Sequence, residues 1–186
     1  RNAADYWPVY HKNITAGNAL KLNDTDAEFG GAQLYTSTAP TSSVFSVGDN
    51  NNINGNGDTY VAYCFAPVEG YSAFGSYEGT GSASTAAFVY TGMRPRWILV
   101  KNADDGTSAS DWFIYDTARS TFNAADDQLY PNRNNAEAVT STHAFDILSN
   151  GFKVKSTSTS ALSNKSGNTY IYAAFAEHPL RHARAR

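Results

Sequence analysis

Apolar and polar residues alternate along this chain in short runs, and one such run occurs twice. The first copy is residues 57–66 (GDTYVAYCFA), and the second is residues 167–176 (GNTYIYAAFA). Each copy opens with a glycine-aspartate or glycine-asparagine turn signal, and aromatic and β-branched residues follow it. A run of this length bounded by turn residues predicts a strand that is buried on both faces of its sheet.

Further stretches repeat in the same order, which predicts a repeated folding unit. The corresponding pairs are residues 7–10 and 112–115, residues 23–28 and 132–137, and residues 44–47 and 151–154. The separation between the copies grows from 105 residues at Trp7 and Trp112 to 110 residues at Tyr60 and Tyr170. Such a drift is typical of small insertions in surface loops, which tolerate length changes better than strands do.

The two copies differ in extent. The second unit includes residues 71–77 and 88–101, which precede Trp112 and have no counterpart before Trp7. Three segments are therefore expected: residues 1–69 as the C-terminal half of a repeat unit, residues 70–180 as a complete unit, and residues 181–186 as a basic tail. A half sandwich exposes strand edges and an apolar face. We therefore expect the half-unit to be covered by the complete unit, by upstream chain or by a neighbouring protomer, and the chain to associate.

The pattern predicts an all-β fold, an antiparallel β-sandwich of jelly-roll or lectin-like type built from one complete repeat and half of another. Aromatic residues make up 13% of the chain, and such residues favour strands. The predicted strands are residues 60–65, 97–100, 112–115, 152–154 and 170–175. The predicted buried residues on them are Tyr60, Phe65, Trp97, Leu99, Trp112, Phe152 and Phe175.

Turn signals place the connections between these strands. Pro95 lacks a backbone N–H and should stand at the entry of a strand. Residues 102–106 should turn the chain into an antiparallel partner, and Asn150-Gly151 is the pair favoured in a type I′ hairpin. The polar tract at residues 48–58 is interpreted as a β-hairpin loop. Its asparagine spacing resembles the start of an EF-hand loop, but Val61 occupies the position of the required glutamate.

Composition excludes two classes of partner. The formal net charge of −3 provides no electrostatic basis for binding nucleic acid. No apolar run approaches the roughly 20 residues that a membrane-spanning helix requires, so we expect no membrane insertion.

The sequence shows no catalytic or metal-binding constellation. Cys64 lies inside the first repeated run, where it is expected to be a buried small hydrophobe. None of the four histidines, His11, His143, His178 and His182, is paired with it or with another ligand at metal-binding spacing. No nucleophile elbow occurs, and the carboxylates are scattered. We therefore expect no enzyme activity, no catalytic residue, no metal site and no cofactor. A glycosidase would need two carboxylates that face one cleft.

Two kinds of residue are candidates for binding, and each has a second interpretation. Trp7, Trp97 and Trp112 lie in apolar contexts that favour core packing, although a tryptophan at a rim could stack on a sugar ring. Residues 49–58 and 156–168 are rich in asparagine, aspartate and serine, which suits binding loops and also solvated turns. The ligand-binding residues stay unassigned at this stage.

Several ordered motifs together carry a family resemblance. In the second unit they are residues 88–95, 147–154 and 169–179, and in the first unit residues 10–12, 22–28, 39–45 and 60–68. With these motifs the chain resembles the repeated β-domain of bacteriophage tail-fibre and virion-surface proteins, which are common in marine and cyanobacterial phages. That family has no defined catalytic residues to transfer to this chain.

The resemblance implies a function class. It predicts a virion structural protein on the phage tail or capsid exterior, which attaches to the host cell surface through a glycan or protein receptor. Its partners would be other virion proteins and further copies of itself, with a trimer favoured. The alternative is a purely structural virion component, such as a decoration, collar or baseplate-attached subunit. A glycan depolymerase is a third, less favoured alternative.

Overall fold

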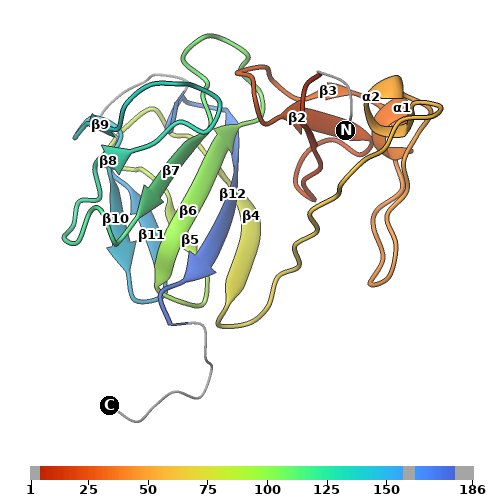
Figure 1. The fold of residues 1–186 in the computed structure, drawn as a ribbon. Coiled ribbons are helices and arrows are strands. Elements are labelled where there is room, and N and C mark those ends of the chain that lie inside the picture. The colour runs from red at the N-terminus through yellow and green to blue at the C-terminus, as the bar shows by residue number, and fades with distance from the viewer. Residues whose placement is uncertain (1–4, 157–161, 179–186) are drawn as a thin grey trace.

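A computed structural model describes residues 5–156 and 162–178 of the chain, and these residues form almost only strands and loops (Figure 1). The elements in chain order are β1 (Pro8–Val9), β2 (Asn18–Lys21), β3 (Phe29–Gly30), α1 (Ala32–Tyr35), α2 (Asn51–Asn54), β4 (Ser72–Glu78), β5 (Phe88–Tyr90), β6 (Pro95–Asn102), β7 (Phe113–Asp116), β8 (Asp127–Gln128), β9 (Ala138–Val139), β10 (Phe145–Leu148), β11 (Gly151–Val154) and β12 (Thr169–Ala176). None of the helices in the described part is long and apolar enough to cross a membrane.

Two antiparallel sheets form a sandwich and confirm the predicted fold class. One sheet has four strands in the order β4-β12-β6-β7, and the other has three in the order β10-β11-β5. The four-stranded sheet forms one layer in Figure 1, and β10 and β11 lie behind it. The predicted pairing of residues 97–100 with the strand after the next turn is confirmed, because Trp97 pairs with Asp116 and Val100 with Phe113.

Aromatic side chains fill the space between the two sheets. Phe113, Tyr115 and Tyr170 point from the four-stranded sheet, and Phe145 and Phe152 from the other, and all five are fully buried. The rings of Phe145 and Phe152 stack at 5.2 Å between centroids. Burying such rings removes a large apolar area from water, so this cluster is the main source of stability.

The central strand β12 is buried on both faces, as the second copy of the repeated run predicts. It forms hydrogen-bonded ladders with β4 on one side and β6 on the other. Tyr170 and Ala174 belong to the core between the sheets, whereas Ile171 faces the opposite way and is 2% exposed. The outer face of this sheet must therefore be covered by another layer.

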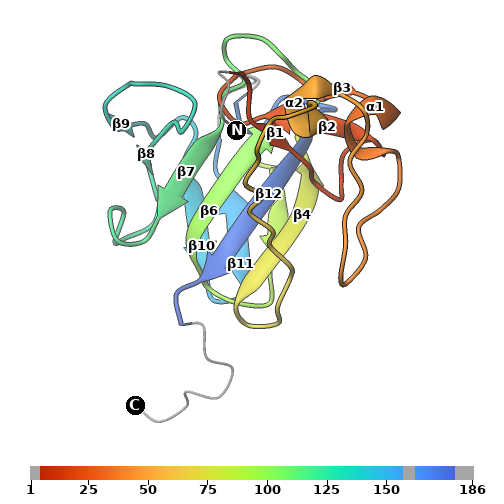
Figure 2. The ribbon, with the colours of Figure 1, turned by 45° about the vertical axis from the view of Figure 1, so that its right-hand side comes forward.

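That layer comes from the N-terminal part of the chain. The small sheet β1-β2-β3 lies over one end of the four-stranded sheet, and Leu20 of β2 packs with Trp112 and Ile171 (Figure 2). The indole Nε1–H of Trp112 donates a 2.7 Å hydrogen bond to the carbonyl oxygen of Lys21. Of the three ways expected for covering the half-unit, packing on the complete unit is observed for this layer.

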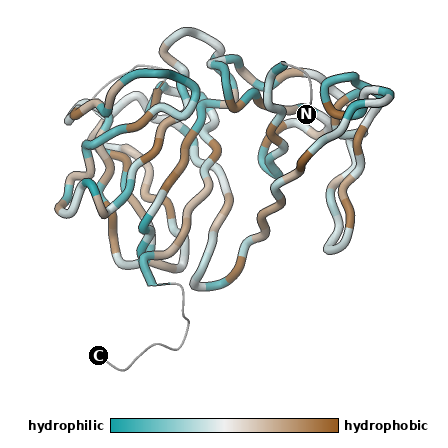
Figure 3. The backbone as a smooth tube through the Cα atoms, in the orientation of Figure 1, coloured by the Kyte–Doolittle hydropathy of each residue, from teal (hydrophilic) through white to brown (hydrophobic). Residues whose placement is uncertain are grey.

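Residues 60–65 do not form the predicted strand. They are extended and exposed, and the backbone of residues 61–65 makes no hydrogen bond to any described residue. The segment leaves the N-terminal layer and crosses toward β4 without a neighbouring strand (Figures 1 and 2). Figure 3 shows hydrophobic residues along it. The prediction is wrong because a strand exists only when an adjacent strand provides its hydrogen bonds. Residues 44–47, also expected to repeat a strand, are extended and exposed for the same reason.

Several predicted buried residues are therefore exposed. Trp7 is 62% exposed, Phe65 is 67% exposed and Tyr60 is 36% exposed. Cys64 is also exposed, so its interpretation as a buried hydrophobe is wrong. Trp112 and Phe152 are buried as predicted. Trp97, Leu99 and Phe175 are half-buried, because they face the outer side of the sheet, which the N-terminal layer covers only in part.

The turns lie where the sequence predicts them, but the β10–β11 turn is of a different type. β6 begins at Pro95 as predicted, and β10 and β11 form the predicted hairpin. Its loop, however, is Ser149-Asn150, and neither residue adopts a positive φ, so the turn is not type I′. Gly151 is needed for another reason, since a Cβ atom there would lie 2.1 Å from the carbonyl oxygen of Val89 on β5.

The polar tract at residues 48–58 is not a hairpin loop. It contains the single helical turn α2, whose N-cap Asn50 accepts a hydrogen bond from the backbone N–H of Asn52. Asparagine is among the preferred N-cap residues, which accounts for a helical turn in a tract without apolar periodicity. The basic tail at residues 181–186 and residues 157–161 of the second candidate loop lie outside the described residues.

Candidate functional site

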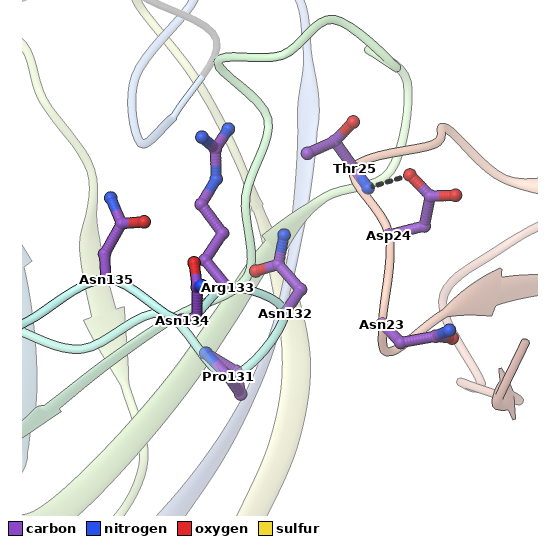
Figure 4. A pocket seen from close by; sticks show the side chains of 8 residues that line it. All are labelled: Asn23, Asp24, Thr25, Pro131, Asn132, Arg133, Asn134 and Asn135. Carbon is purple, nitrogen blue, oxygen red and sulfur yellow. Dashed lines mark hydrogen bonds between the residues drawn. The ribbon is translucent and has the colours of Figure 1, made fainter.

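An open hollow with polar walls lies between the N-terminal layer and the sandwich, and is called the polar hollow below. Its volume is about 590 Å³. The lining residues are Asn23, Asp24, Thr25, Pro131, Asn132, Arg133, Asn134 and Asn135. Figure 4 shows the two groups of side chains on separate backbone segments that face each other.

The two walls are corresponding turns, one from each sequence copy. In the first copy, the backbone N–H of Trp7 donates to Oδ1 of Asn23 over 2.8 Å. In the second, the backbone N–H of Trp112 donates to Oδ1 of Asn132 over 3.1 Å. The sequence had paired residues 23–28 with residues 132–137, but it could not show that the two turns meet across one hollow.

Contacts to the sandwich hold the first wall in place. Lys101 on β6 is fully buried, and its Nζ donates hydrogen bonds to the carbonyl oxygens of Thr25 at 3.0 Å and Asn102 at 2.6 Å. Burial lowers the pKa of Lys101 from its ordinary value to about 8, although nearby carboxylates, Asp105 and Asp111 among them, act in the opposite direction. The carbonyl oxygen of Thr25 thus ties the turn to the buried ammonium group of β6, although burial disfavours the charged form of Lys101.

Asp111 holds the second wall. Its carboxylate accepts a 2.7 Å hydrogen bond from Nδ2 of Asn132 and forms an ion pair with the guanidinium group of Arg133. Arg133 also donates to the carbonyl oxygen of Ser108. The side chains of Asn132 and Arg133 are therefore oriented before any ligand arrives, which limits the entropy lost on binding.

Other lining groups are available to a ligand. Asn134 and Asn135 are exposed, and their side chains make no hydrogen bond to any residue that the structure describes. Asp24 accepts a hydrogen bond from the backbone N–H of Thr25 through Oδ1 (Figure 4). Amides both donate and accept, and a carboxylate accepts, so the set suits a ligand rich in hydroxyl groups.

A second, smaller hollow of about 350 Å³ shares Arg133 and Asn135 with the polar hollow. His143 and Leu162 line it, and burial lowers the pKa of His143 below its ordinary value. Its imidazole is therefore the neutral form near pH 7.

The residues singled out from the sequence as binding candidates contribute little to either hollow. Trp7 is exposed, Trp112 is buried beneath the N-terminal layer, and residues 49–58 line neither hollow. Of the described part of the candidate loop at residues 156–168, Leu162 alone lines a hollow, the second one. No group of three histidine, cysteine, aspartate or glutamate side chains that could hold a metal occurs within residues 5–156 and 162–178. The signal that could have located the polar hollow was the repeated asparagine-rich turn.

Comparison with known proteins provides a family. Residues 1–179 match the model of a family described as a domain of unknown function, DUF7483. The match covers both the N-terminal layer and the sandwich. Neither a curated protein nor a solved structure matches the chain.

Proposed function

The chain belongs to the DUF7483 family, and we propose that it is a phage virion-surface protein of tail-fibre type whose polar hollow binds a host-surface glycan. The motif resemblance to phage fibre domains supports the virion part of the proposal. The polar hollow carries the glycan part, because its pre-oriented amides, carboxylate and guanidinium match the hydroxyl groups of a sugar.

The geometry suits an extended sugar chain better than a small enclosed ligand. The polar hollow is open, and Asn134 and Asn135 stand on its exposed rim. Open sites with adaptable hydrogen-bonding side chains bind through several moderate contacts, so single-site affinity is low. Repeated copies in an oligomeric fibre would raise the overall affinity through multivalency.

Binding is tested with a glycan array and with competition for phage adsorption to host cells, both using the 186-residue chain. We expect selected glycans to bind, and the double variant Asn134→Ala/Asn135→Ala to bind them roughly tenfold more weakly, since each neutral hydrogen bond is worth about 0.5–1.5 kcal/mol. The matched control is Asn56→Ala, an exposed asparagine outside the hollow. Equal binding by the double variant and the control would refute the site.

The second candidate function is a purely structural virion component without a receptor. The exposed apolar segment at residues 60–65 favours it, since surfaces of this kind serve assembly. Under this alternative the chain binds no glycan on the array and does not compete for adsorption, but it binds virion particles that lack it.

Hydrolysis is not part of the proposal. Asp24 is the carboxylate among the eight lining residues of the polar hollow. Glycoside hydrolysis generally uses two carboxylates on opposite sides of the scissile bond. We therefore expect that a glycan bound there is not cleaved. An end-group assay on the eluted glycan would check this.

A further inference from the structure

The same residue types are buried in the second sequence copy and exposed in the first. Trp112 and Ile171 are each 2% exposed, whereas their counterparts Trp7 and Val61 are 62% and 72% exposed. The contrast extends to a third pair, since Phe152 is fully buried and Phe45 is 43% exposed. Exposed apolar groups in such number mark a surface that is covered in the working protein.

The first copy nevertheless folds like the second where its neighbouring strands are present. Val9 of β1 pairs antiparallel with Leu20 of β2, and the corresponding residues Ile114 and Leu129 form an antiparallel bridge. The hydrogen bond from tryptophan to asparagine at the following turn also occurs in both copies. The local geometry thus follows the sequence correspondence up to this point.

The two copies diverge where the second one needs strands that precede β7 in sequence. β12 takes its hydrogen bonds from β4 and β6, and β11 takes part of its own from β5. Residues 5–68 contain no counterparts of these three strands. Residues 59–65, called the arm below, correspond to β12, and residues 44–47 correspond to β11.

We propose that the arm and residues 44–47 dock a partner polypeptide segment that has the strand pattern of residues 71–102 of this chain. The arm inserts between the β4-like and β6-like strands of that segment and becomes the central strand of a second sandwich. Val61 then takes the outward position that Ile171 has in β12, and Cys64 takes the position of Ala174, which is fully buried.

A second copy of the chain does not satisfy this requirement. Each copy has one set of strands β4, β5 and β6, and that set is already paired with its own β11 and β12. If two copies exchanged these strands, each arm that gained partner strands would leave one β12 without them. The occupant is therefore an additional segment of this strand type.

The reactivity of Cys64 can report on docking. Cys64 is exposed in the unfused chain, and the sequence contains one cysteine. The experiment fuses an extra copy of residues 70–106 to the N-terminus of the full chain. Alkylation of Cys64 by iodoacetamide is followed, together with hydrogen–deuterium exchange of the amides at residues 61–65. We expect fast alkylation in the unfused chain and alkylation slowed at least about 100-fold in the fusion, with new amide protection, because thiol and amides become buried in a sheet.

The matched control is the same fusion carrying Ala62→Asp. Ala62 is exposed in the unfused chain, so the substitution should not affect the existing fold. In the fusion Ala62 takes the position of Tyr172, which belongs to the core between the sheets, so a charge there should prevent docking and Cys64 should stay fast-reacting. Three outcomes would overturn the proposal: unchanged alkylation of Cys64 in the fusion, a fused segment that stays unfolded, or an unfused chain that dimerises and protects Cys64 by itself.

Discussion

The indole Nε1–H of Trp112 donates a 2.7 Å hydrogen bond to the carbonyl oxygen of Lys21, 91 residues earlier in the chain. This bond joins the sandwich to the N-terminal layer. Because Trp112 is 2% exposed and packs on Leu20, the contact combines a polar anchor with a large apolar area. The same layer carries one wall of the polar hollow, so the contact also positions the candidate site.

Replacing Trp112 tests this anchor. We expect Trp112→Phe to lower the free energy of unfolding by about 2 kcal/mol, because the smaller ring leaves space and the carbonyl oxygen of Lys21 keeps only the 3.3 Å hydrogen bond from the backbone N–H of Asp24. Urea denaturation measures this loss of unfolding free energy. Trp97→Phe is the matched control: Trp97 is half-buried and contacts Phe175 through its ring, so a loss below about 1 kcal/mol is expected. Equal losses would contradict the anchor.

Gly151 tests the close approach of two strands. Gly151→Ala would place a Cβ atom 2.1 Å from the carbonyl oxygen of Val89, so the backbones of β5 and β11 must separate. We expect a loss of at least about 2 kcal/mol in thermal unfolding. Asn150→Ala, at the neighbouring exposed turn position without a positive φ, should change stability by less than about 0.5 kcal/mol. A larger loss for Asn150→Ala than for Gly151→Ala would show that the turn conformation, and not the close approach of β5 and β11, determines stability here.

His11 makes the protein sensitive to acid. It is buried, and desolvation lowers its pKa to about 4 from the ordinary 6.5, with a smaller effect of Lys12 in the same direction. Between pH 6.5 and pH 4 the unfolded chain binds a proton that the folded chain does not. Stability therefore falls as the pH falls through this window, by about 3 kcal/mol at most.

The slope of unfolding free energy against pH between 6.5 and 4 measures this effect. In His11→Gln the part due to His11 should disappear, while His178→Gln, at an exposed position, should keep the slope of the wild type. A wild-type slope that persists in His11→Gln would assign the acid sensitivity to other groups.

Lys101 makes stability rise with pH in the same way as His11, but in the alkaline range. Its pKa in the folded chain is about 8 because it is buried, whereas in the unfolded chain it is near 10.5. Between these values the unfolded chain holds the extra proton, so stability rises by about 1–2 kcal/mol from pH 8 to pH 9.5. Above pH 10 stability should fall, because burial raises the pKa of Tyr77 and Tyr115 and keeps them protonated only in the folded chain.

Denaturation at fixed pH values between 7 and 10.5 would show this maximum. Lys101→Met should remove the rise between pH 8 and pH 9.5 and keep the fall above pH 10. A wild-type curve that is flat across the first window would show that the Lys101 ammonium is not desolvated in the folded chain.

Much of the fold could be predicted from the sequence because its signals are local. Alternation and turn residues located β6, β7, β11 and β12, and Pro95 marked the start of β6. These elements obey rules of steric fit and periodicity that hold without knowledge of the neighbours. The polar hollow was not predicted, since it requires that Asn23 and Asn132, both in turns that the sequence had paired, face each other in space.

By itself the sequence determined which segments are able to be strands, and the tertiary structure decided which of them are. Residues 57–66 and 167–176 share one pattern, yet the second forms the central strand β12 and the first stays extended and exposed. The physical reason is that a strand obtains its hydrogen bonds and its buried faces from other segments. β4 and β6 flank β12 and Leu20 covers Ile171, whereas no described residue flanks the backbone around Val61.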